Sequence, residues 1–410
     1  MDRTPITIAG QRETAQHPLQ SQVRPGSLAE PARSLYVHVP FCFHKCHYCD
    51  FYSIVDTRDR QAPFTDRLIA ELDHLAPFAG PLETVFIGGG TPTLLRPDLW
   101  RRLLAALYDR FDLARAEFTV ECNPETATTE LFAILAGGGV NRVSIGAQSF
   151  NPTHLKTLER WHDPQNVGRA VELARQAGIE RQSVDLIFAI PGQTLEQWQA
   201  DLETALDLGV THMSCYALTY EPNTAMTARM SRGDFAPAPE DLEADMLERT
   251  LEMLRSAGLQ RYEVSNFATP GLECEHNLAY WRQEQWLAAG PSASGHVAGW
   301  RWKNVPRLDS YLGDLPYQGV PPAIDVEPPD PARALAERLM TTLRLREGLP
   351  IACTLARAAQ VRPDLPERLE ATALRYQRSG HLDITDTRWQ LTDAGMMLAD
   401  GIAAEFMSQI

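Results

Sequence analysis

The most informative stretch of the chain is LYVHVPFCFHKCHYC, residues 35–49, in which a short apolar run leads directly into three cysteines. The run LYVHVP has the length and composition of a buried strand, and Pro40 ends it. Cys42, Cys46 and Cys49 therefore fall in the loop at the carboxyl end of a predicted strand. Similar runs recur further along: TVFIGGG at 84–90, EFTVECNP at 117–124, RVSIGAQ at 142–148, SVDLIFAIP at 183–191 and HMSCYALTY at 212–220.

Segments with helical periodicity separate these runs, for example PDLWRRLLAALYDRF and NVGRAVELARQAGI. Six strand–helix units in series indicate parallel strands joined by crossover helices. We expect an α/β fold arranged as a full or partial (β/α) barrel, with a doubly wound open sheet as the alternative. In both architectures the chemistry lies at the carboxyl ends of the strands, where the cysteines are predicted.

Composition divides the chain into five parts. Residues 1–33 lack periodicity and are expected to form a flexible arm, and residues 34–258 form the barrel core. Residues 259–318 are rich in aromatic residues and glycine and include the expected strand RYEVSNF, and the Pro-rich segment 319–331 is expected to be a linker. Residues 332–410 are expected to be a helical, winged-helix-like domain, because HLDITDTRWQLT has the pattern of a hairpin.

The composition excludes several classes of protein. The 410 residues are 44% hydrophobic, which is enough for a large core and excludes wholesale disorder. With 38 basic and 53 acidic residues the net charge is −15, which disfavours nucleic-acid binding. No apolar run approaches the ~18 residues of a membrane span, and the N-terminus lacks the apolar region of a secretory signal, so we expect a cytoplasmic protein.

Three closely spaced thiols in a reducing compartment suit either zinc or an iron–sulfur cluster. Zinc would need His44 or His47 as a fourth ligand, and it usually takes paired ligands from two separate knuckles, which this chain lacks. The aromatic residues around the thiols suit a cluster that is shielded from water. Three cysteines on a four-iron cluster leave one iron without a protein ligand, and an open metal position is what a reactive site needs. We therefore expect an iron–sulfur cluster.

Glycines and polar residues follow the other strands at the same predicted edge. The tract Gly88–Gly90 removes side chains at the end of the second strand, so a ligand can approach the backbone closely. Glu121 ends the third strand, Gln148 ends the fourth, and Asp185 interrupts the apolar fifth. Each alone is compatible with an ordinary ion pair or hydrogen bond. Together with Arg160 they place polar groups around one opening, which indicates a ligand site beside the cysteines.

The C-x₃-C-x₂-C spacing resembles that of the radical S-adenosylmethionine (SAM) superfamily. Over about residues 35–350, the motifs YVHVPFC, FIGGGTPT, VECNP, SIGAQSF and DLIFAIPGQT resemble the group that contains oxygen-independent coproporphyrinogen III oxidase and the HemW heme chaperones. The resemblance implies a 4Fe–4S cluster on Cys42, Cys46 and Cys49, with SAM on the open iron and a 5′-deoxyadenosyl radical as the product of SAM cleavage. It also implies a set of SAM-binding residues: Tyr36, Gly89, Gly90, Thr91, Glu121, Gln148, Arg160, Asp185 and Thr219.

Two features separate the members of this group. The oxidase pattern has a further cysteine two residues after the third cluster ligand, where this chain has Phe51. The oxidases also have a longer N-terminal region. A phenyl ring can neither ligate a metal nor donate a proton. The HemW pattern HNxxYW matches at every fixed position and implies four heme-binding residues: His276, Asn277, Tyr280 and Trp281. A neutral imidazole is a common ligand of heme iron, with Cys274 as the alternative ligand. The competing interpretation makes the two aromatic residues part of the core.

The resemblance therefore implies a heme chaperone that binds a 4Fe–4S cluster, SAM and heme and delivers heme to apo-hemoproteins such as respiratory cytochromes. The alternatives are the oxidase, which removes two propionate carboxyl groups, and a radical SAM enzyme that acts on heme. We favour the binding role and assign no catalytic residue. We expect no transmembrane segment, association with membranes only through partners, and either a monomer or a homodimer.

Overall fold

The computed structural model describes residues 14–313 and 319–410. Its main sheet has the strand order β12-β11-β10-β9-β1-β2-β3-β4-β5-β6-β8-β7. Seven adjacent strands are parallel: β9 (Trp286–Ala289), β1 (Ala32–Val39), β2 (Ala79–Gly89), β3 (Glu117–Cys122), β4 (Arg142–Gln148), β5 (Arg181–Phe188) and β6 (His212–Ala217). Each of the six predicted apolar runs coincides with one of the strands β1–β6. The expected series of parallel strands is therefore confirmed.

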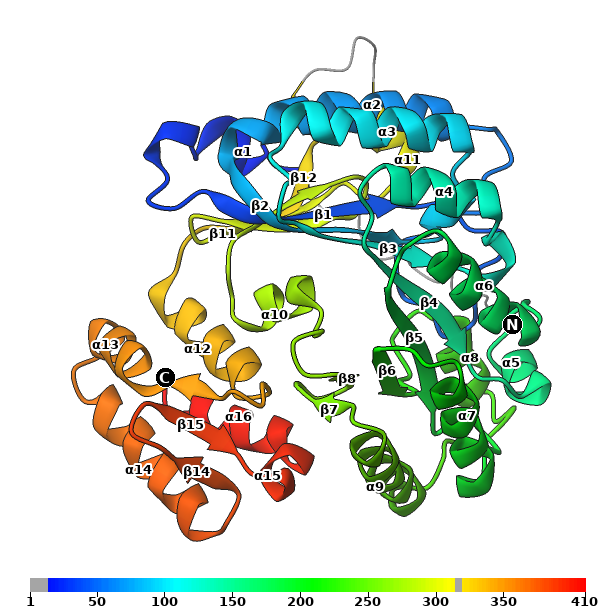
Figure 1. Cartoon of the computed structure of the whole chain (residues 1–410). Helices are drawn as coiled ribbons and strands as arrows, with labels where there is room; N and C mark the ends of the chain where they lie inside the picture. Colours follow the sequence, from blue (N-terminus) through cyan, green and yellow to red (C-terminus); the bar gives the residue numbers. More distant parts are fainter. Residues whose placement is uncertain (1–13, 314–318) are drawn as a thin grey trace, which may run out of the picture.

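The sheet is an open, partial barrel (Figure 1). Strands β1 to β6 lie side by side in chain order without the reversal that defines a doubly wound sheet, so the doubly wound alternative is wrong. The connecting helices cover the outer face: α2 (Gln61–Leu75), α3 (Pro97–Arg110), α4 (Thr129–Gly137), α6 (Gln165–Gln176) and α7 (Leu195–Asp207). The barrel does not close, because β1 pairs with β9 and β6 pairs with β8.

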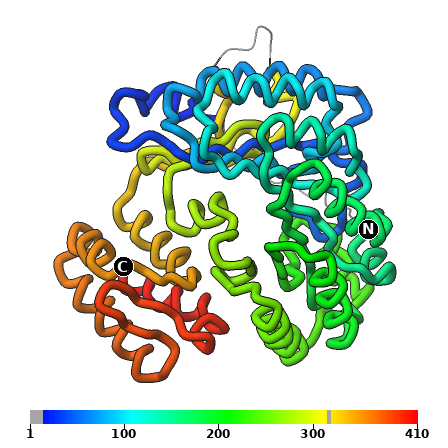
Figure 2. The backbone as a smooth tube through the Cα atoms, viewed as in Figure 1, coloured from blue at the N-terminus to red at the C-terminus, as the bar shows by residue number. Residues whose placement is uncertain are grey.

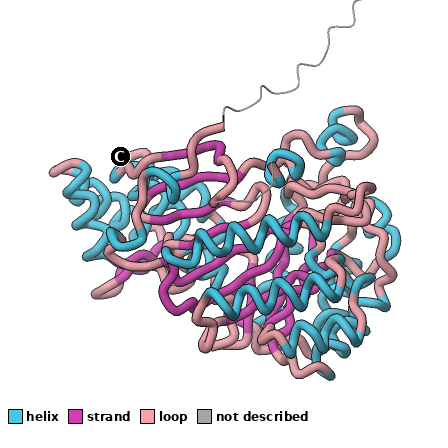
Figure 3. The backbone as a smooth tube through the Cα atoms, turned by 90° about the horizontal axis from the view of Figure 1, so that it is seen from above, coloured by secondary structure: helices cyan, strands magenta, loops and turns pink. Residues whose placement is uncertain are grey.

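Antiparallel strands extend the parallel sheet at both edges. Figure 3 shows the strands in magenta and the helices in cyan. They are β10 (Ser294–Val297), β11 (Trp300–Asn304) and β12 (Ala323–Glu327) at one edge, and β7 (Gln260–Arg261) and β8 (Asn266–Ala268) at the other. Two expectations are corrected here. The predicted linker 319–331 contributes β12 to the sheet. The predicted single strand at 261–267 is a hairpin, because the backbone N–H of Tyr262 donates to the carbonyl of Asn266 and turns the chain back.

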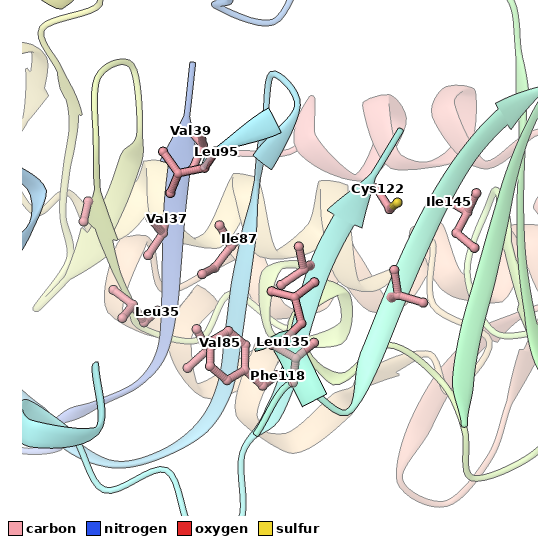
Figure 4. Close-up of a cluster of buried hydrophobic side chains, with 14 of the residues drawn as sticks. Leu35, Val37, Val39, Val85, Ile87, Leu95, Phe118, Cys122, Leu135 and Ile145 are labelled. Carbon is pink, nitrogen blue, oxygen red and sulfur yellow. The ribbon is translucent and has the colours of Figure 1, made fainter. Parts of the chain in front are cut away.

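Side chains alternate strictly between the two faces of the parallel strands. Leu35, Val37 and Val39 of β1 and Val85 and Ile87 of β2 are fully buried against the helices (Figure 4). The intervening side chains point to the concave face and are largely polar, among them Tyr36, His38, Thr119, Glu121, Arg142, Ser144, Asp185 and His212. Period-two alternation therefore separates an apolar core from a polar inner surface.

The flexible arm predicted for residues 1–33 is wrong where the structure describes it. Helix α1 (Pro18–Ser21) begins after His17, whose Nδ1 accepts the backbone N–H of Leu19 at 3.1 Å. His17 packs edge-on against Trp302 with 4.8 Å between ring centroids, and Leu19 is buried. This segment therefore gains enough apolar contact to be held on the sheet. Residues 1–13 of the predicted arm lie outside the described residues.

A separate module follows the sheet (Figure 2, orange to red). It contains the helices α12 (Pro331–Thr342), α13 (Ile351–Val361), α14 (Leu365–Arg378), α15 (Asp393–Met397) and α16 (Ala399–Met407), and the strands β13 (Leu349–Pro350), β14 (Leu382–Ile384) and β15 (Arg388–Leu391). Strands β14 and β15 form the predicted hairpin. The module has its own hydrophobic core, centred on Leu339, Leu369 and Phe406.

The remaining helices are short or lie at the rim: α5 (Pro152–Thr157), α8 (Ala225–Ser231), α9 (Glu240–Ser256), α10 (Glu275–Trp281) and α11 (Leu308–Leu312). Helix α10 lies on the concave side of the sheet, facing the C-terminal module (Figure 1). Its Trp281 carbonyl accepts a hydrogen bond from the Thr342 hydroxyl of α12 at 3.2 Å. No helix in the described ranges is both long and apolar enough to cross a membrane.

A buried carboxylate joins α2 to the β9–β11 edge of the sheet. Glu71 accepts hydrogen bonds from the Gly290 backbone (3.0 Å), the Asn304 amide (2.7 Å) and the Tyr311 hydroxyl. We predict that Glu71→Leu lowers the free energy of unfolding by about 3 kcal/mol or more, because several buried donors then lose their acceptor. Urea unfolding followed by circular dichroism measures the change. Glu252→Leu on exposed α9 is the control, expected within about 0.5 kcal/mol of the wild type. Equal effects of the two substitutions would contradict the prediction.

Candidate functional site

Two adjoining cavities open on the concave side and at the carboxyl edge of the parallel strands. The first has a volume of about 620 Å³ and is lined by Cys42, Cys46 and Cys49, so we call it the cysteine cavity. The second, of about 540 Å³, is lined by His276 and Tyr280 and is the histidine cavity. Six residues line both cavities and form a shared wall: Asp50, Phe51, Glu121, Ser144, Asp185 and Tyr216.

The loop after β1 carries the three predicted cluster ligands into the cysteine cavity. Its two ends are pinned together, because the Cys42 N–H donates to the Ile54 carbonyl at 2.9 Å and the Ile54 N–H donates to the Pro40 carbonyl at 2.8 Å. Cys42 Sγ lies 3.5 Å from the Thr91 hydroxyl, and Cys46 Sγ lies 3.8 Å from Arg160 Nη1. The thiols therefore face the glycine-rich turn and the predicted SAM-binding arginine.

The thiols fit a cluster better than a zinc ion. Among the residues that the structure describes, no three cysteine, histidine or acidic side chains converge closely enough to hold a single metal ion. His44 is stacked on Trp161 with 4.1 Å between centroids, and His47 Nδ1 lies 3.2 Å from Arg229 Nη1. Neither histidine completes a tetrahedron with the thiols. A cubane spreads its ligands over separate irons and accepts this wider spacing.

Burial raises the pKa of the Cys49 thiol to about 11 and raises that of Cys42 above its ordinary value. Without a bound metal, the Cys42 and Cys49 thiols are therefore protonated at neutral pH. Metal binding at these residues would release protons, because thiolates are the ligands.

The glycine tract at the end of β2 leaves space that side chains would fill. A Cβ on Gly88 would lie 2.8 Å from the carboxyl group of Glu121, and one on Gly90 would lie 2.8 Å from the backbone of Pro40 and Phe41. Gly89 has φ +108° and donates its N–H to Glu121 Oε2 at 3.0 Å. Gly89 and Gly90 thus line the cysteine cavity without side chains, and their binding of a ligand stays a prediction.

A local irregularity in β4 turns Gln148 toward the cavity. The register against β5 shifts between Gly146 and Gln148, and Gln148 has φ +64°, which is rare for a residue other than glycine. A Cβ on Gly146 would lie 2.7 Å from the Gln148 amide and 3.2 Å from Arg160 Nη2. Arg160 Nη2 in turn donates to the Gly146 carbonyl at 2.9 Å. The absence of a side chain at Gly146 lets both polar groups reach the cavity.

Two partly buried carboxylates, Glu121 and Asp185, lie in the shared wall. Burial raises the pKa of Glu121 to about 7, the Gly89 N–H opposes this shift, and nearby Asp185 adds to it. Burial also raises the pKa of Asp185, although Ser144, Ser183 and Ser214 all donate hydrogen bonds to it, the shortest at 2.7 Å. These carboxylates suit the amino and sulfonium cations of a ligand such as SAM.

The structure brings eight of the nine predicted SAM-binding residues into the cysteine cavity: Gly89, Gly90, Thr91, Glu121, Gln148, Arg160, Asp185 and Thr219. Tyr36 is the exception. It lines the histidine cavity, where its hydroxyl lies 3.0 Å from His38 Nδ1.

His276 is a buried, neutral imidazole that lines the histidine cavity. It is 2% exposed, and burial lowers its pKa to about 3, so the imidazole is uncharged at neutral pH. A hydrogen bond of 2.7 Å joins Nδ1 to the Thr84 hydroxyl, and the rings of Phe86 and Tyr280 pack around it. Nε2 has no hydrogen-bond partner among the described residues. With the proton on Nδ1, Nε2 presents a free lone pair.

The rest of the HNxxYW motif divides around helix α10. Asn277 and Tyr280 line the histidine cavity, and the Asn277 amide donates to the Tyr262 hydroxyl at 3.1 Å. Trp281 does not line the cavity and packs instead with Leu278, Tyr262 and Leu345. The HNxxYW motif predicts that Trp281 contacts heme, but the structure places Trp281 in the packing between α10 and the C-terminal module.

Sequence reasoning misses two further residues of the histidine cavity, Arg142 and His212. Both are buried at the beginning of a strand and point to the concave face. The signal is present in the alternation: Arg142 is two residues before Ser144, and His212 is two residues before Ser214. A charged residue in phase with a polar inner face indicates a cavity lining.

Comparisons with known proteins agree with this geometry. A family model described as the radical SAM superfamily matches residues 36–205, and one described as the HemN C-terminal domain matches residues 330–398. The heme chaperone HemW of Mycobacterium tuberculosis (strain H37Rv) is 37% identical over 387 residues, which are 92% of this chain and 96% of that protein. The chain belongs to the HemW family.

Another HemW relative, from Escherichia coli K12, is 35% identical over 92% of this chain and 99% of its own length. The solved structure of coproporphyrinogen III oxidase (HemN) from Escherichia coli, a radical SAM enzyme, superposes with a TM-score of 0.80 over 96% of this chain and 93% of that chain, at 23% identity. This likeness shows the fold. The family and fold predicted from the motifs are confirmed, and the roles of individual residues stay predictions.

The raised pKa of Glu121 predicts a pH-dependent stability. The unfolded chain loses this proton near pH 4.5 and the folded chain near pH 7, so the folded state binds more protons between these values. Raising the pH across this window therefore lowers the free energy of unfolding. Glu121→Gln cannot titrate. We predict that the variant gains about 3 kcal/mol relative to the wild type between about pH 4 and about pH 8.

Denaturant unfolding of both proteins across this range measures the difference. Glu130→Gln, at a carboxylate that is 63% exposed, controls for the general loss of a negative charge. A difference between wild type and Glu121→Gln that does not change with pH would contradict the raised pKa.

Proposed function

We propose that this chain is a heme chaperone, which holds a 4Fe–4S cluster and SAM in the cysteine cavity, binds heme in the histidine cavity and passes it to apo-hemoproteins such as respiratory cytochromes. The observation that carries the proposal is the buried, neutral His276, whose Nε2 has no hydrogen-bond partner among the described residues and which lines a cavity beside the cysteines. An unsatisfied nitrogen in such a position is costly unless a ligand completes it.

Several features support an iron ligand at this nitrogen. Thr84 fixes the ring through Nδ1, as the partners of metal-bound histidines do. Tyr36, Phe86 and Tyr280 surround the imidazole with aromatic surface that suits a porphyrin. The alternative ligand Cys274 is less suitable, because its thiol donates to Glu117 Oε1 at 3.5 Å and burial raises its pKa to about 12. We therefore assign the axial position to His276.

The cysteine cavity supports the cluster and SAM through its own residues. Cys42, Cys46 and Cys49 supply the three thiolates, and the Gly89–Gly90 backbone, Glu121 and Asp185 line the space beside them. When bound, such a cluster supplies an electron to SAM. Arg160 places a positive charge 3.8 Å from the Cys46 sulfur.

Phe51 favours chaperone activity over oxidase activity. It occupies the position where the oxidase pattern has a cysteine, is 62% exposed and lines both cavities. Its phenyl ring has no proton to give to a substrate radical or anion.

Anaerobic incubation with coproporphyrinogen, SAM and reductant should yield no protoporphyrinogen at a catalytic rate. Incubation with heme and SAM should likewise cause no SAM-dependent loss of heme absorbance.

We predict that Cys46→Ser abolishes cluster binding. The anaerobically reconstituted wild type should contain about four irons per chain and absorb broadly near ~400 nm, whereas the variant should have lost the cluster with one of its three thiolates. Iron analysis and absorbance measure the difference. Cys353→Ser, at an exposed thiol in the C-terminal module, is the control and should retain the iron. A wild type that holds zinc and no iron would contradict the prediction.

We predict that His276→Ala weakens hemin binding by at least about tenfold and removes the Soret shift of a histidine-ligated heme, and that Thr84→Val weakens binding about tenfold by releasing the ring. Titration of hemin into the reconstituted protein measures both. His381→Ala, in the C-terminal module, is the control. Unchanged affinity in His276→Ala would place the heme site elsewhere.

A further inference from the structure

Arg142 is a guanidinium buried inside the histidine cavity without a full set of partners. It begins β4 and points to the concave face, where it lines the cavity. The residue is 2% exposed, and its Nη1 has no hydrogen-bond partner among the described residues. Burying a guanidinium costs several kcal/mol unless an anion and hydrogen bonds compensate it.

The acidic residues nearest to Arg142 are engaged with other groups. Glu117 forms an ion pair with Arg181 at 2.7 Å and accepts the backbone N–H of His276 at 3.3 Å. Asp185 accepts hydrogen bonds from three serine hydroxyls. Both carboxylates contribute to the electrostatic environment of Arg142, but neither forms a hydrogen bond with Nη1. Nη1 is therefore a buried donor without a partner among the described residues, in a side chain that lines the cavity.

The remaining lining indicates what kind of molecule brings that carboxylate. Phe86, Tyr280 and Trp286 provide flat apolar surface, and Lys303 adds a second positive charge that belongs to this cavity alone. The acidic residues of the cavity, Asp50, Glu121 and Asp185, belong to the wall shared with the cysteine cavity. Positive charge and aromatic surface thus characterise the part of the cavity away from the shared wall.

We propose that Arg142 binds a carboxylate of the molecule that occupies the histidine cavity, so that the cavity selects planar ligands with acidic side chains. The inference rests on the proposed function in that heme is the expected ligand, with a propionate on Arg142 and iron at His276. A guanidinium binds a carboxylate through paired, charge-assisted hydrogen bonds, which an ester cannot replace.

The first test compares ligands on the wild-type protein, reconstituted anaerobically. Hemin and hemin dimethyl ester share the ring and the iron and differ in the two carboxylates. Hemin should bind about 10- to 100-fold more tightly, the range expected for hydrogen bonds to a charged group. The same preference should appear between protoporphyrin and its dimethyl ester, followed by fluorescence, which tests the carboxylates without iron. Equal affinities for acid and ester overturn the role of Arg142.

The second test assigns the preference to Arg142. Arg142→Met should weaken hemin binding to the level of the ester and leave the affinity for the ester unchanged, and Arg142→Lys should retain part of the preference. Arg169→Met is the control, because it removes an exposed guanidinium on α6 that lines neither cavity. Thermal unfolding and iron content show whether each variant is folded.

If Arg142→Met does not fold, the Arg142→Lys variant and the comparison of acid with ester decide whether Arg142 causes the preference. A preference for acids that persists in Arg142→Lys at full strength, or is lost equally in Arg169→Met, overturns the assignment.

The outcomes separate this inference from the proposed function. Hemin binding without discrimination against the ester leaves the heme site in place and rejects the carboxylate anchor. His276→Ala should lose the Soret signature of the axial ligand and keep the preference for acids over esters, which supports the anchor independently of iron ligation. A wild type that binds neither hemin nor protoporphyrin overturns both proposals.

Discussion

The carboxylate of Glu121 lies in the wall between two cavities, and the parallel register of β2 and β3 holds it there. The N–H of Gly89 donates to it, and only a residue without a side chain fits opposite it at Gly88. A slip of one residue in this register would turn Glu121 toward the helices and an apolar neighbour into the cavities. The glycine tract, the cysteine loop and the shared wall therefore depend on one strand alignment.

Much of the fold could be predicted because each signal was local. The apolar runs predict β1–β6, and the carboxyl ends of parallel strands must meet at one edge, so residues distant in sequence, such as Cys42 and Asp185, could be placed around one opening. The cysteine cavity follows from that rule and from the motif resemblance. Its detailed geometry does not: the positive φ of Gln148 arises from a register shift against β5, which depends on the pairing of two strands rather than on local composition.

The histidine cavity was harder to predict because its lining comes from the interior of strands and from a helix that packs across them. The motif HNxxYW indicates the helix that borders the cavity, but it does not indicate which side of that helix faces the cavity. Residues four apart share a face, so Tyr280 follows His276 into the cavity, whereas Trp281 is turned by one further residue into the packing against the C-terminal module. The prediction of a flexible N-terminal arm failed for a similar reason. His17 packs against Trp302, which is nearly three hundred positions away in the sequence, and no local pattern reveals this contact.

The shared wall also links the two cavities electrostatically. Glu121 has a pKa near 7, so its charge responds to ligands on either side. A cation in the cysteine cavity favours the ionised carboxylate, and an anion close to it in the histidine cavity favours the protonated form. A ligand that changes the charge of Glu121 in one cavity therefore changes the affinity of the other cavity for its own ligand. Because coupling free energies are reciprocal, the second ligand changes the affinity for the first by the same factor. Arg142 compensates for an anion on the far side of this wall, since it lines only the histidine cavity. An acidic ligand can thus bind with its carboxylate away from Glu121. The positive charge of Arg142 on one side and the carboxylate of Glu121 on the other then orient the ligand in the histidine cavity.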